Sequence, residues 1–287
     1  MSVLPSRILL ATDGSEDAAL ATRAAVDISR KSGSELHLVH IWRNVPSPYA
    51  QSFVKRELQR QGQEVLDKQA KRIEDDGGRI SGMHLRQGRI SDEVIELSRE
   101  LEADLLVVGS RGHGQIGRIL MGSHSKEIVH RARLPVLVLR RTTVWPPVRL
   151  VIGDDYSEDA KKAGELAASL GGFFGIREAL LIRTYPRLVE QASDVGASDY
   201  AMQRAEKDLE ARATKLEDVL GYRPQTKLAA GEAAVAILEA AREGDGSALI
   251  AVGSRGLGTV GRTRLGSTST KVVQAAPGPV LVYPQVR

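Results

Sequence analysis

Glycine and serine recur at fixed spacing in two segments of this chain. Residues 109–112 read Gly-Ser-Arg-Gly, and a Gly-Ser pair follows at 122–123; residues 253–256 and 266–267 repeat both parts at the same spacing. Glycine has no Cβ, so its backbone can approach a ligand closely. The free N–H groups at the start of a helix suit phosphate. The spacing therefore predicts two phosphate-binding loops, in which the hydroxyls of Ser123, Ser125, Ser267 and Ser269 could serve as further donors.

The alternative is a strand-to-helix turn that needs glycine only for the path of its backbone. Two copies with identical spacing favour a ligand over this alternative. Other glycine motifs fit less well. Residues 112–117 and 256–261 match G-x-G-x-x-G, but a dinucleotide fingerprint follows the first strand of its unit, and these segments follow the fourth. No lysine follows the glycines as a P-loop requires.

Further internal repeats show that the loops belong to two similar domains. Residues 8–18 read ILLATDGSEDA and residues 150–160 read LVIGDDYSEDA, while LPVLVL at 134–139 corresponds to GPVLVY at 278–283. A length of 287 residues suits two domains. The segment TTVWPP breaks regular structure between the halves. We therefore predict one domain at 1–142 and a second at 148–287.

Each half alternates apolar strand-like segments with amphipathic helical ones. In the first half we expect strands at 7–11, 36–42, 80–86, 105–108 and 136–140, and helices at 17–32, 54–75, 91–101 and 123–131. Ser91 is the expected N-cap of the third helix and Gly33 the C-cap of the first. The second half repeats the order, with its long helix at 201–219. Such alternation predicts an α/β fold with a doubly wound, five-stranded parallel sheet in each domain.

Composition narrows the classes of function. The chain has no cysteine, which excludes disulfides and thiolate chemistry, and its six histidines show no metal-ligand spacing. Its 40 basic and 36 acidic residues are interspersed and aromatics are few, so we expect no nucleic-acid partner. No apolar segment is long enough to span a membrane and no signal peptide is visible, so a cytoplasmic location is expected.

The combination of these motifs resembles the ATP-binding branch of the universal stress protein family. An Asp at the end of the first strand, the G-x2-G-x9-G-S loop and the closing P-V-L-V strand carry the resemblance, twice along the chain. In that family the early Asp and the end of the second strand hold adenine, while the glycine loop holds ribose and phosphates. The resemblance implies nucleotide-binding residues in the first half at Asp13, Ile41, Val108, Gly109, Arg111, Gly112, Gly122, Ser123 and His124. In the second half it implies Asp155, Thr184, Val252, Gly253, Arg255, Gly256, Gly266, Ser267 and Thr268.

The second half departs from the first on the adenine side. Tyr156 replaces Gly14, so we expect a narrower site there. Residues 183–185 read Arg-Thr-Tyr where residues 40–42 read His-Ile-Trp, so we expect a better apolar wall in the first half. Asp13 is equally consistent with a residue that favours the start of a helix.

The basic residues of the loops are also consistent with ordinary solvent-exposed positions. We interpret His113 and His124 as surface-loop histidines, since their counterparts are Leu257 and Thr268. The recurring arginines of the two loops face either phosphate or solvent.

The predicted function is a stress-response regulator that binds ATP, with Mg²⁺, and acts through conformation or partner binding. No general base is shared by both halves, so hydrolysis is expected to be slow at most, and we expect no catalytic residue and no protein-bound metal. A scaffold of the same fold that binds no nucleotide is the alternative; an adenylyl-transferring enzyme would need a further motif. Resemblance to the family also implies that the fifth strands, 136–139 and 280–283, pair within the chain. A homodimer of the whole chain is expected in addition.

Overall fold

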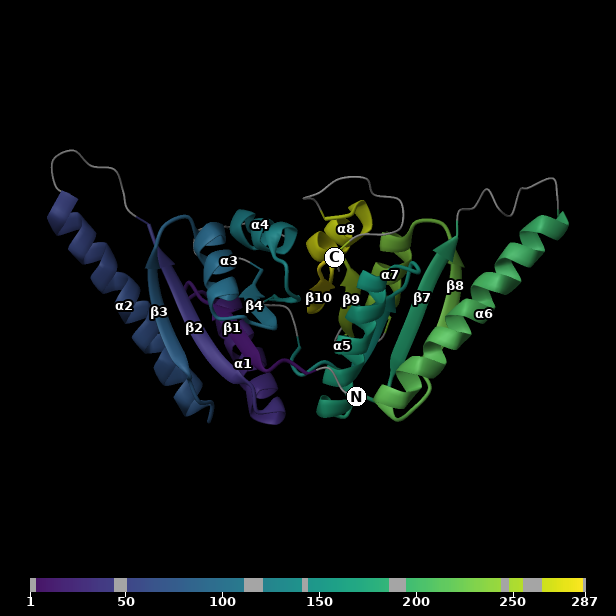
Figure 1. Cartoon of the computed structure of the whole chain (residues 1–287), viewed down its shortest axis with the longest axis horizontal. Coiled ribbons are helices and arrows are strands. Elements are labelled where there is room, and N and C mark those ends of the chain that lie inside the picture. Colours follow the sequence, from purple (N-terminus) through teal and green to yellow (C-terminus); the bar gives the residue numbers. More distant parts are fainter. Residues whose placement is uncertain are drawn as a thin grey trace. The chain divides into compact units, whose positions relative to one another are not determined.

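The computed structural model describes residues 4–43, 51–110, 121–140, 144–185, 195–243, 248–254 and 265–285. The chain divides into two compact units. We call Pro5–Trp145 the first unit, and Pro146–Arg287, with which Met1–Leu4 is grouped, the second unit. Each unit is an alternation of strands and helices (Figure 1).

The first unit contains five strands and four helices among its described residues. In chain order they are β1 (Arg7–Ala11), α1 (Glu16–Ser32), β2 (Glu35–Trp42), α2 (Gln51–Asp75), β3 (Gly82–Gln87), α3 (Ile90–Glu100), β4 (Leu105–Gly109), α4 (Ser123–Arg131) and β5 (Val136–Leu139).

The second unit repeats this order in its described residues. Its elements are β6 (Arg149–Gly153), α5 (Glu158–Phe174), β7 (Ala179–Tyr185), α6 (Val195–Leu220), β8 (Gln225–Ala230), α7 (Ala233–Arg242), β9 (Ala248–Gly253), α8 (Ser267–Ala275) and β10 (Val280–Tyr283).

All strand pairs within each unit are parallel. The order in the first unit is β3-β2-β1-β4-β5, and in the second it is β8-β7-β6-β9-β10. The chain moves outward from β1 in one direction through β2 and β3, and then returns to the other side of β1 as β4. Ligands of open α/β sheets bind beyond the carboxyl ends of strands at such a reversal. The predicted doubly wound α/β class is confirmed.

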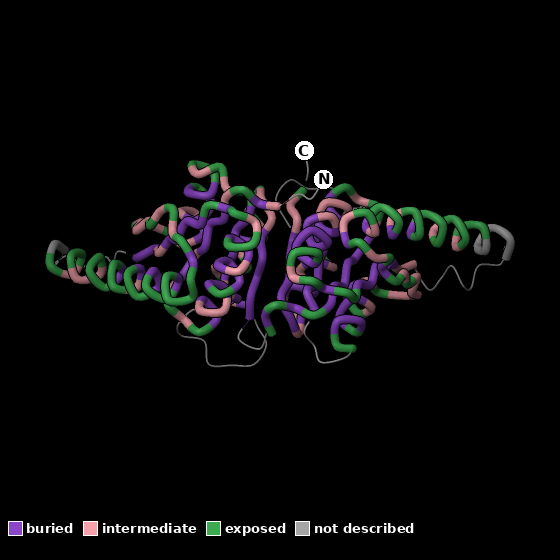
Figure 2. The backbone as a smooth tube through the Cα atoms, turned by 90° about the horizontal axis from the view of Figure 1, so that it is seen from below, coloured by how far each residue is buried: buried purple, intermediate pink, exposed green. Residues whose placement is uncertain are grey.

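Helices cover both faces of each sheet (Figure 1). α1 and α2 pack against one face of the first sheet, and α3 packs against the other, beside α4; α5 with α6 and α7 with α8 are arranged in the same way. The inner strands β1, β4, β6 and β9 are buried, whereas the long helices expose polar residues along one side (Figure 2). This explains why the inner strands are almost entirely apolar and the long helices are not.

Capping residues define the first helix of each unit. The Ser15 side chain accepts a hydrogen bond from the amide of Ala18 at 3.2 Å, and Ser157 does the same for Ala160 at 3.1 Å. Gly33 ends α1 with φ at 74°, as predicted for a left-handed C-cap. These caps fix the start of each helix a few residues beyond the end of its preceding strand.

Several predicted boundaries are shifted. α3 begins at Ile90 rather than at an N-cap Ser91, because the amides of Asp92 and Glu93 both donate to the Arg89 carbonyl; Ser91 is buried inside the helix. α6 begins at Val195, six residues before the predicted start. β3 begins at Gly82 instead of residue 80, since it pairs with β2 only from His37 onward.

Candidate functional site

A cavity of about 240 Å³ lies at the carboxyl ends of β1, β2 and β4 in the first unit. The strand register brings these ends together, because Ala11 is aligned with Val39 on one side and with Val108 on the other. The first turns of α3 and α4 complete the lining. Seven of the predicted residues of this half line this cavity: Asp13, Ile41, Val108, Gly109, Gly122, Ser123 and His124.

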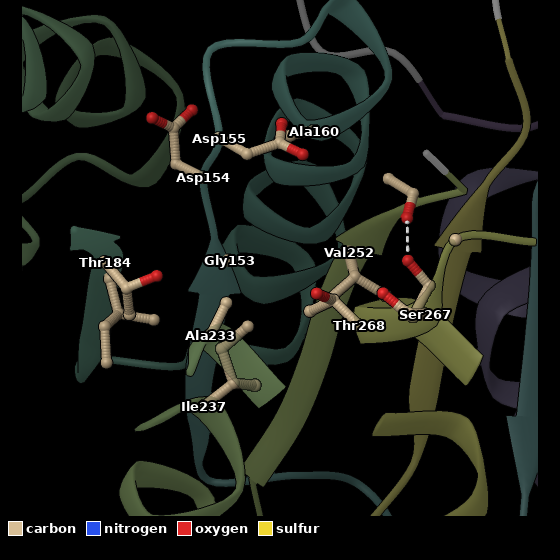
Figure 3. A pocket seen from close by; sticks show the side chains of 14 residues that line it. Gly153, Asp154, Asp155, Ala160, Thr184, Ala233, Ile237, Val252, Ser267 and Thr268 are labelled. Atoms are coloured by element: carbon tan, nitrogen blue, oxygen red, sulfur yellow. Dashed lines mark hydrogen bonds between the residues drawn. The ribbon is translucent and has the colours of Figure 1, made fainter. Parts of the chain in front are cut away.

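The second unit has a cavity of about 330 Å³ in the equivalent position. Its lining also includes seven predicted residues: Asp155, Thr184, Val252, Gly253, Gly266, Ser267 and Thr268. Figure 3 shows Thr184 on one side of this cavity and Ser267 with Thr268 on the other, with Ile237 and Ala233 between them. The remaining predicted residues, Arg111, Gly112, Arg255 and Gly256, and also His113, lie outside the described part of the chain.

Each cavity contains the N-terminus of a helix that no side chain caps. Gly122 is the N-cap of α4 and Gly266 that of α8, and neither helix has a side-chain capping bond among the described residues. The first backbone bond within α4 runs from the Lys126 amide to the Gly122 carbonyl at 3.0 Å. The amides of residues 123–125 precede it and have no acceptor within the helix. These N–H groups and the positive end of the helix dipole favour an anion in the cavity.

The loop that precedes this helix is tied to the strand end in the same way in both units. The Gly122 amide donates to the Ser110 carbonyl at 2.7 Å, and the Gly266 amide donates to the Ser254 carbonyl at 2.7 Å. The Ser110 hydroxyl donates to the buried carboxylate of Asp17 at 2.7 Å. Asp159 accepts the equivalent bond from Ser254 at 3.1 Å. The sequence analysis missed these serine–aspartate pairs, although both aspartates recur in the SEDA repeat.

Two glycines of the loop are required by helix packing. A Cβ on Gly109 would lie 2.9 Å from the carbonyl carbon of Asp17, and one on Gly253 would lie 2.7 Å from the amide nitrogen of Ala160. Both contacts are with the backbone at the start of α1 or α5. Gly109 is therefore required by the close approach of the first helix to the strand end, and its predicted contact with a ligand stays a prediction.

The serines at the third position of α4 and α8 are also committed elsewhere. The Ser125 hydroxyl donates to the Gly109 carbonyl at 2.7 Å, and the Ser269 hydroxyl donates to the Gly253 carbonyl at 2.6 Å. In this structure the proton of each hydroxyl is therefore engaged, and the predicted role of these serines as phosphate donors stays a prediction. Ser123, Ser125, Ser267 and Ser269 all line the cavities.

Asp13 and Asp155 stand at the turn between strand and helix. An Asp13 oxygen accepts a hydrogen bond from the Ser15 amide at 3.0 Å. Asp155 accepts from both the amide and the hydroxyl of Ser157, at 3.0 and 2.5 Å. Both carboxylates shape the start of the helix and also line a cavity. The two interpretations of Asp13 are compatible with one position.

The cavity walls differ between the units. The first cavity is lined by the apolar side chains of Val39, Ile41, Ile90, Val94 and Ile128, in addition to Val108. In the second, Thr184 takes the place of Ile41 and Ala233 that of Ile90. A flat apolar group such as a purine base would find more complementary surface in the first cavity.

Tyr156 does not narrow the second cavity as expected. Its φ angle is 70°, its side chain is 47% exposed, and it does not line the second cavity. Its ring lies over the guanidinium of Arg183, 3.5 Å from the ring centre to Cζ. A tyrosine can adopt this conformation only at an energetic cost, and the cation–π contact offsets part of it.

A buried ionic cluster adjoins the second cavity, whose lining includes Asp154. The side chain of Asp154 is 1% exposed and pairs with Arg183 and Arg212, which are 4% and 17% exposed. Arg212 donates to Asp154 at 2.8 and 3.1 Å, and Arg183 Nε donates at 2.9 Å. In Figure 3 the Asp154 carboxylate points away from Ser267 and Thr268. Its charge is compensated by two guanidinium groups.

His124 does not occupy a surface loop, contrary to our interpretation. It lies in the first turn of α4, lines the first cavity and has a buried Nδ1. Its Nε2 accepts a hydrogen bond from Arg43, which follows the end of β2. Burial lowers the pKa of His124, and the charge of Arg43 lowers it further.

Two further histidines form a pair that is remote from the cavity. His37 Nδ1 and His84 Nε2 lie 3.1 Å apart, with the rings stacked at 5.4 Å. Both residues precede the carboxyl ends of their strands, so they do not reach the cavity lining. Across the described ranges no group of three or more His, Cys, Asp or Glu side chains is arranged to hold a metal ion. No helix in these ranges is long and apolar enough to cross a bilayer.

The fold and the two cavities define a tandem of doubly wound α/β domains, each with one ligand-sized cavity at the sheet reversal. The sequence profile of the universal stress protein family matches residues 5–140 and again residues 148–284. The chain belongs to the universal stress protein family.

Relatives extend over one or both units. A universal stress protein of Mycobacterium bovis is 28% identical over 73% of this chain and 74% of its own length. One from Thermus aquaticus is 32% identical over 46% of this chain and 97% of its own length. The crystal structure of a universal stress protein from Archaeoglobus fulgidus aligns with 98% of this chain and 99% of its own, at a TM-score of 0.71 and 24% identity. This structural likeness supports the fold.

Proposed function

We propose that this protein is an ATP-binding regulator of the stress response, with one nucleotide site in each unit. The main support is the convergence in each unit of seven residues that are predicted from separated sequence motifs. They line one cavity next to an uncapped helix N-terminus. In the proposal, adenine lies between Asp13 and Ile41 in the first unit, and the phosphates lie at Gly122 and Ser123. Mg²⁺ arrives with the phosphates of the nucleotide.

Regulation by nucleotide requires occupancy at cellular concentrations. A Kd in the micromolar range corresponds to about −8 kcal/mol and would keep the sites full at millimolar cytoplasmic ATP, where we propose the protein acts. Binding at a ligand concentration of about 100 times the Kd stabilises the folded state by ~2.7 kcal/mol. The bound form would then differ from the free form in stability and in the partners it can recruit. Slow hydrolysis would reset the protein without making it a metabolic enzyme.

The alternative function is an interaction scaffold that binds no nucleotide. It would leave the uncapped helix ends and the cavities without a ligand in both units. A polar helix terminus at a cavity is satisfied by water or by an anion, so the distinction is experimental. Mass spectrometry of the small molecules released from the purified, denatured protein identifies the natural occupant. An adenine nucleotide is expected, and AMP or a cyclic nucleotide in place of ATP would change the proposed ligand.

Substitution of the N-cap glycines tests the site itself. Gly122 and Gly266 have φ and ψ of −60° and 150°, and −61° and 158°, which any residue adopts. Aspartate is a favourable N-cap, so Gly122→Asp and Gly266→Asp should leave the helices folded. Each new carboxylate would occupy the free amides and repel phosphate.

Calorimetry with ATP should therefore give two bound nucleotides per chain in the wild type and one in either variant. In the wild type, the site in the first unit should bind ATP more tightly than the site in the second. The double variant should bind none. If the wild type shows neither heat nor a thermal shift at millimolar ATP, the proposal is wrong. If the double variant binds ATP with unchanged affinity, nucleotide binds elsewhere. Adenosine serves as the uncharged reference ligand.

A further inference from the structure

His124, which lines the first cavity, has a second basic side chain next to it. Arg43 extends from the end of β2 and donates a hydrogen bond to His124 Nε2. The other ring nitrogen, Nδ1, is buried and has no hydrogen-bond partner in the described part of the chain. Since Nε2 accepts, Nδ1 carries the proton of the neutral ring. An unpaired buried donor next to an arginine and a helix N-terminus provides a strong local preference for an acceptor or an anion.

The neighbouring charges leave this preference intact. Arg89, the N-cap of α3, and Glu127, one turn after His124, also face the histidine. Glu127 is paired with Arg89 at 2.8 Å and with Arg131 at 3.0 Å, so its charge is compensated by two guanidinium groups. Arg131 in turn contacts Asp92. Among the described groups that face His124, Arg43 is the one whose charge no ion pair compensates, and His124 itself can become charged.

The second cavity has neither basic group at its equivalent positions. The residue at the His124 position is Thr268, and the residue after β7 is a proline, Pro186, in sequence. The N-cap of α7 is Glu232, which pairs with Lys271 at 2.6 Å. Here the N-cap residue is acidic and its partner is basic, which is the reverse of Arg89 with Glu127, and the pair is neutral overall. Among the described residues, the first cavity therefore has Arg43 and His124 beside its helix end, whereas the second has Asp154 with its two paired arginines.

We propose that Arg43 and His124 make the first cavity selective for the more highly phosphorylated nucleotide, whereas the second cavity accepts ligands of lower charge. The proposal rests on nucleotide binding in both units and assigns a different charge preference to each. Its physical basis is that a guanidinium and an imidazolium stabilise each added phosphate charge. A neutral threonine cannot. The chain would then sense the balance between triphosphate and monophosphate through two unequal sites.

Proton uptake is a direct consequence of this arrangement. The low pKa of His124 in the free protein, caused by burial and by Arg43, leaves it neutral near pH 7. A bound polyphosphate favours the charged ring and raises that pKa. The added proton binds Nε2, so Arg43 releases this nitrogen and is free to contact the phosphates. The bound state then holds more protons than the free state, so the affinity for ATP rises as the pH falls through the pKa of the complex. It levels off below the pKa of the free protein. The site in the second unit has no group at this position that titrates in the range.

The test uses two single-site proteins, Gly266→Asp to isolate the first site and Gly122→Asp to isolate the second. The affinities of ATP, AMP and adenosine are measured by calorimetry. We expect the ratio of ATP to AMP affinity to be about tenfold higher in the first site, which corresponds to ~1.4 kcal/mol. Equal ratios in the two sites would overturn the proposal. If neither protein binds ATP or adenosine, the proposed function itself fails.

Substitutions at the rim identify the residues responsible. In the first-site protein, Arg43→Gln should weaken ATP about tenfold and adenosine less than twofold, in keeping with loss of one charge-assisted contact. Arg99→Gln is the matched control, since Arg99 is exposed near the C-terminal end of α3, away from the cavity lining. Equal effects of Arg43→Gln on ATP and adenosine would show that Arg43 shapes the cavity without reading charge.

An exchange of the paired residues tests the pH dependence. His124→Thr in the first-site protein should flatten the pH profile of ATP affinity between about pH 5 and 8, the range of histidine titration. Thr268→His in the second-site protein should create such a profile. Calorimetry in buffers of different ionisation enthalpy measures the protons taken up. A wild-type first site with the same pH profile as His124→Thr would contradict the role of His124. Thermal unfolding of each variant confirms that it is folded.

Discussion

At the scale of single residues, one type of amino acid has different functions at neighbouring positions of the same loop. Gly109 and Gly253 are required because the first helix of each unit approaches the strand end closely. Gly122 and Gly266 have ordinary backbone angles and lack a capping side chain, which leaves the helix amides open to a ligand. The same motif therefore combines a packing requirement with a binding requirement.

The packing role of Gly253 leads to a prediction about stability. Gly253→Ala should destabilise the second unit by about 1–3 kcal/mol, the usual cost of overpacking, even without nucleotide. Gly172→Ala, inside α5, is the matched control. Its Cβ would lie 3.5 Å from the nearest atom, the Val219 carbonyl oxygen, which is an ordinary contact distance. That change should be neutral or stabilise by up to ~1 kcal/mol.

Denaturant unfolding followed by far-UV circular dichroism compares the two variants. Trp42 and Trp145 both belong to the first unit, so tryptophan fluorescence should detect little change in either variant. A Gly253→Ala protein as stable as the wild type would show that the helix can move away from the strand at no cost.

At the scale of elements, equivalent strand ends are stabilised by different chemistry in the two units. The ends of β6 and β7 are joined to α6 by the cluster of Asp154, Arg183 and Arg212. In the first unit the corresponding contacts contain no ion pair: His40 Nδ1 bonds the Thr12 carbonyl at 2.8 Å, and Gln69 bonds Thr22 on α1. A buried charge cluster is costly to assemble but also costly to break.

Removal of the shared carboxylate should therefore be strongly destabilising. Asp154→Asn leaves two guanidinium groups without their counter-charge, and we expect a loss of about 3–5 kcal/mol in the free energy of unfolding. The triple variant Asp154→Thr, Arg183→His and Arg212→Gln carries the uncharged residue types of the first unit. It should recover at least half of that loss. Equilibrium unfolding of both variants decides this, and a triple variant less stable than Asp154→Asn would contradict the explanation.

At the scale of the whole molecule, two units with separate cores and separate cavities are joined in one chain. Each core is formed around its own inner strands, β1 with β4 and β6 with β9. If both units bind nucleotide as proposed, two unequal sites on one chain would permit a graded response, because each unit would change stability with its own ligand. How this response is transmitted depends on the assembly of the units.

Pairing of β5 with β10 and a homodimer of the chain stay predictions. Each strand lies at the end of the sheet order in its unit, and an unpaired apolar edge favours association. If the two edges pair, hydrogen exchange should show protection of the amides on both sides of β5 and β10. Fast exchange of alternate amides in these strands would rule out the pairing. Light scattering should give the mass of two chains, and a mass of 31.0 kDa at micromolar concentration would exclude a stable dimer.

The sequence by itself determined the two-domain repeat, the alternation of strands and helices and the residues at the sheet reversal. These features follow from local periodicity and from glycine spacing, which are properties of short segments. It also located fourteen residues that the structure places at the two cavity linings. It did not determine boundaries such as the start of α3, because backbone hydrogen bonds and not side-chain type set the first turn.

Tertiary structure alone decided what each of those residues contacts. The contacts of Gly109 with α1, of Ser125 with the Gly109 carbonyl and of Arg43 with His124 join positions that are far apart in sequence. No local pattern records such distances. The charge of a cavity rim depends in the same way on which ion pairs are closed, as Glu127 with Arg89 shows. Motif spacing located the sites, and the packing of separate elements determined their chemistry, because hydrogen bonds and charges act over a few ångströms in space and not along the chain.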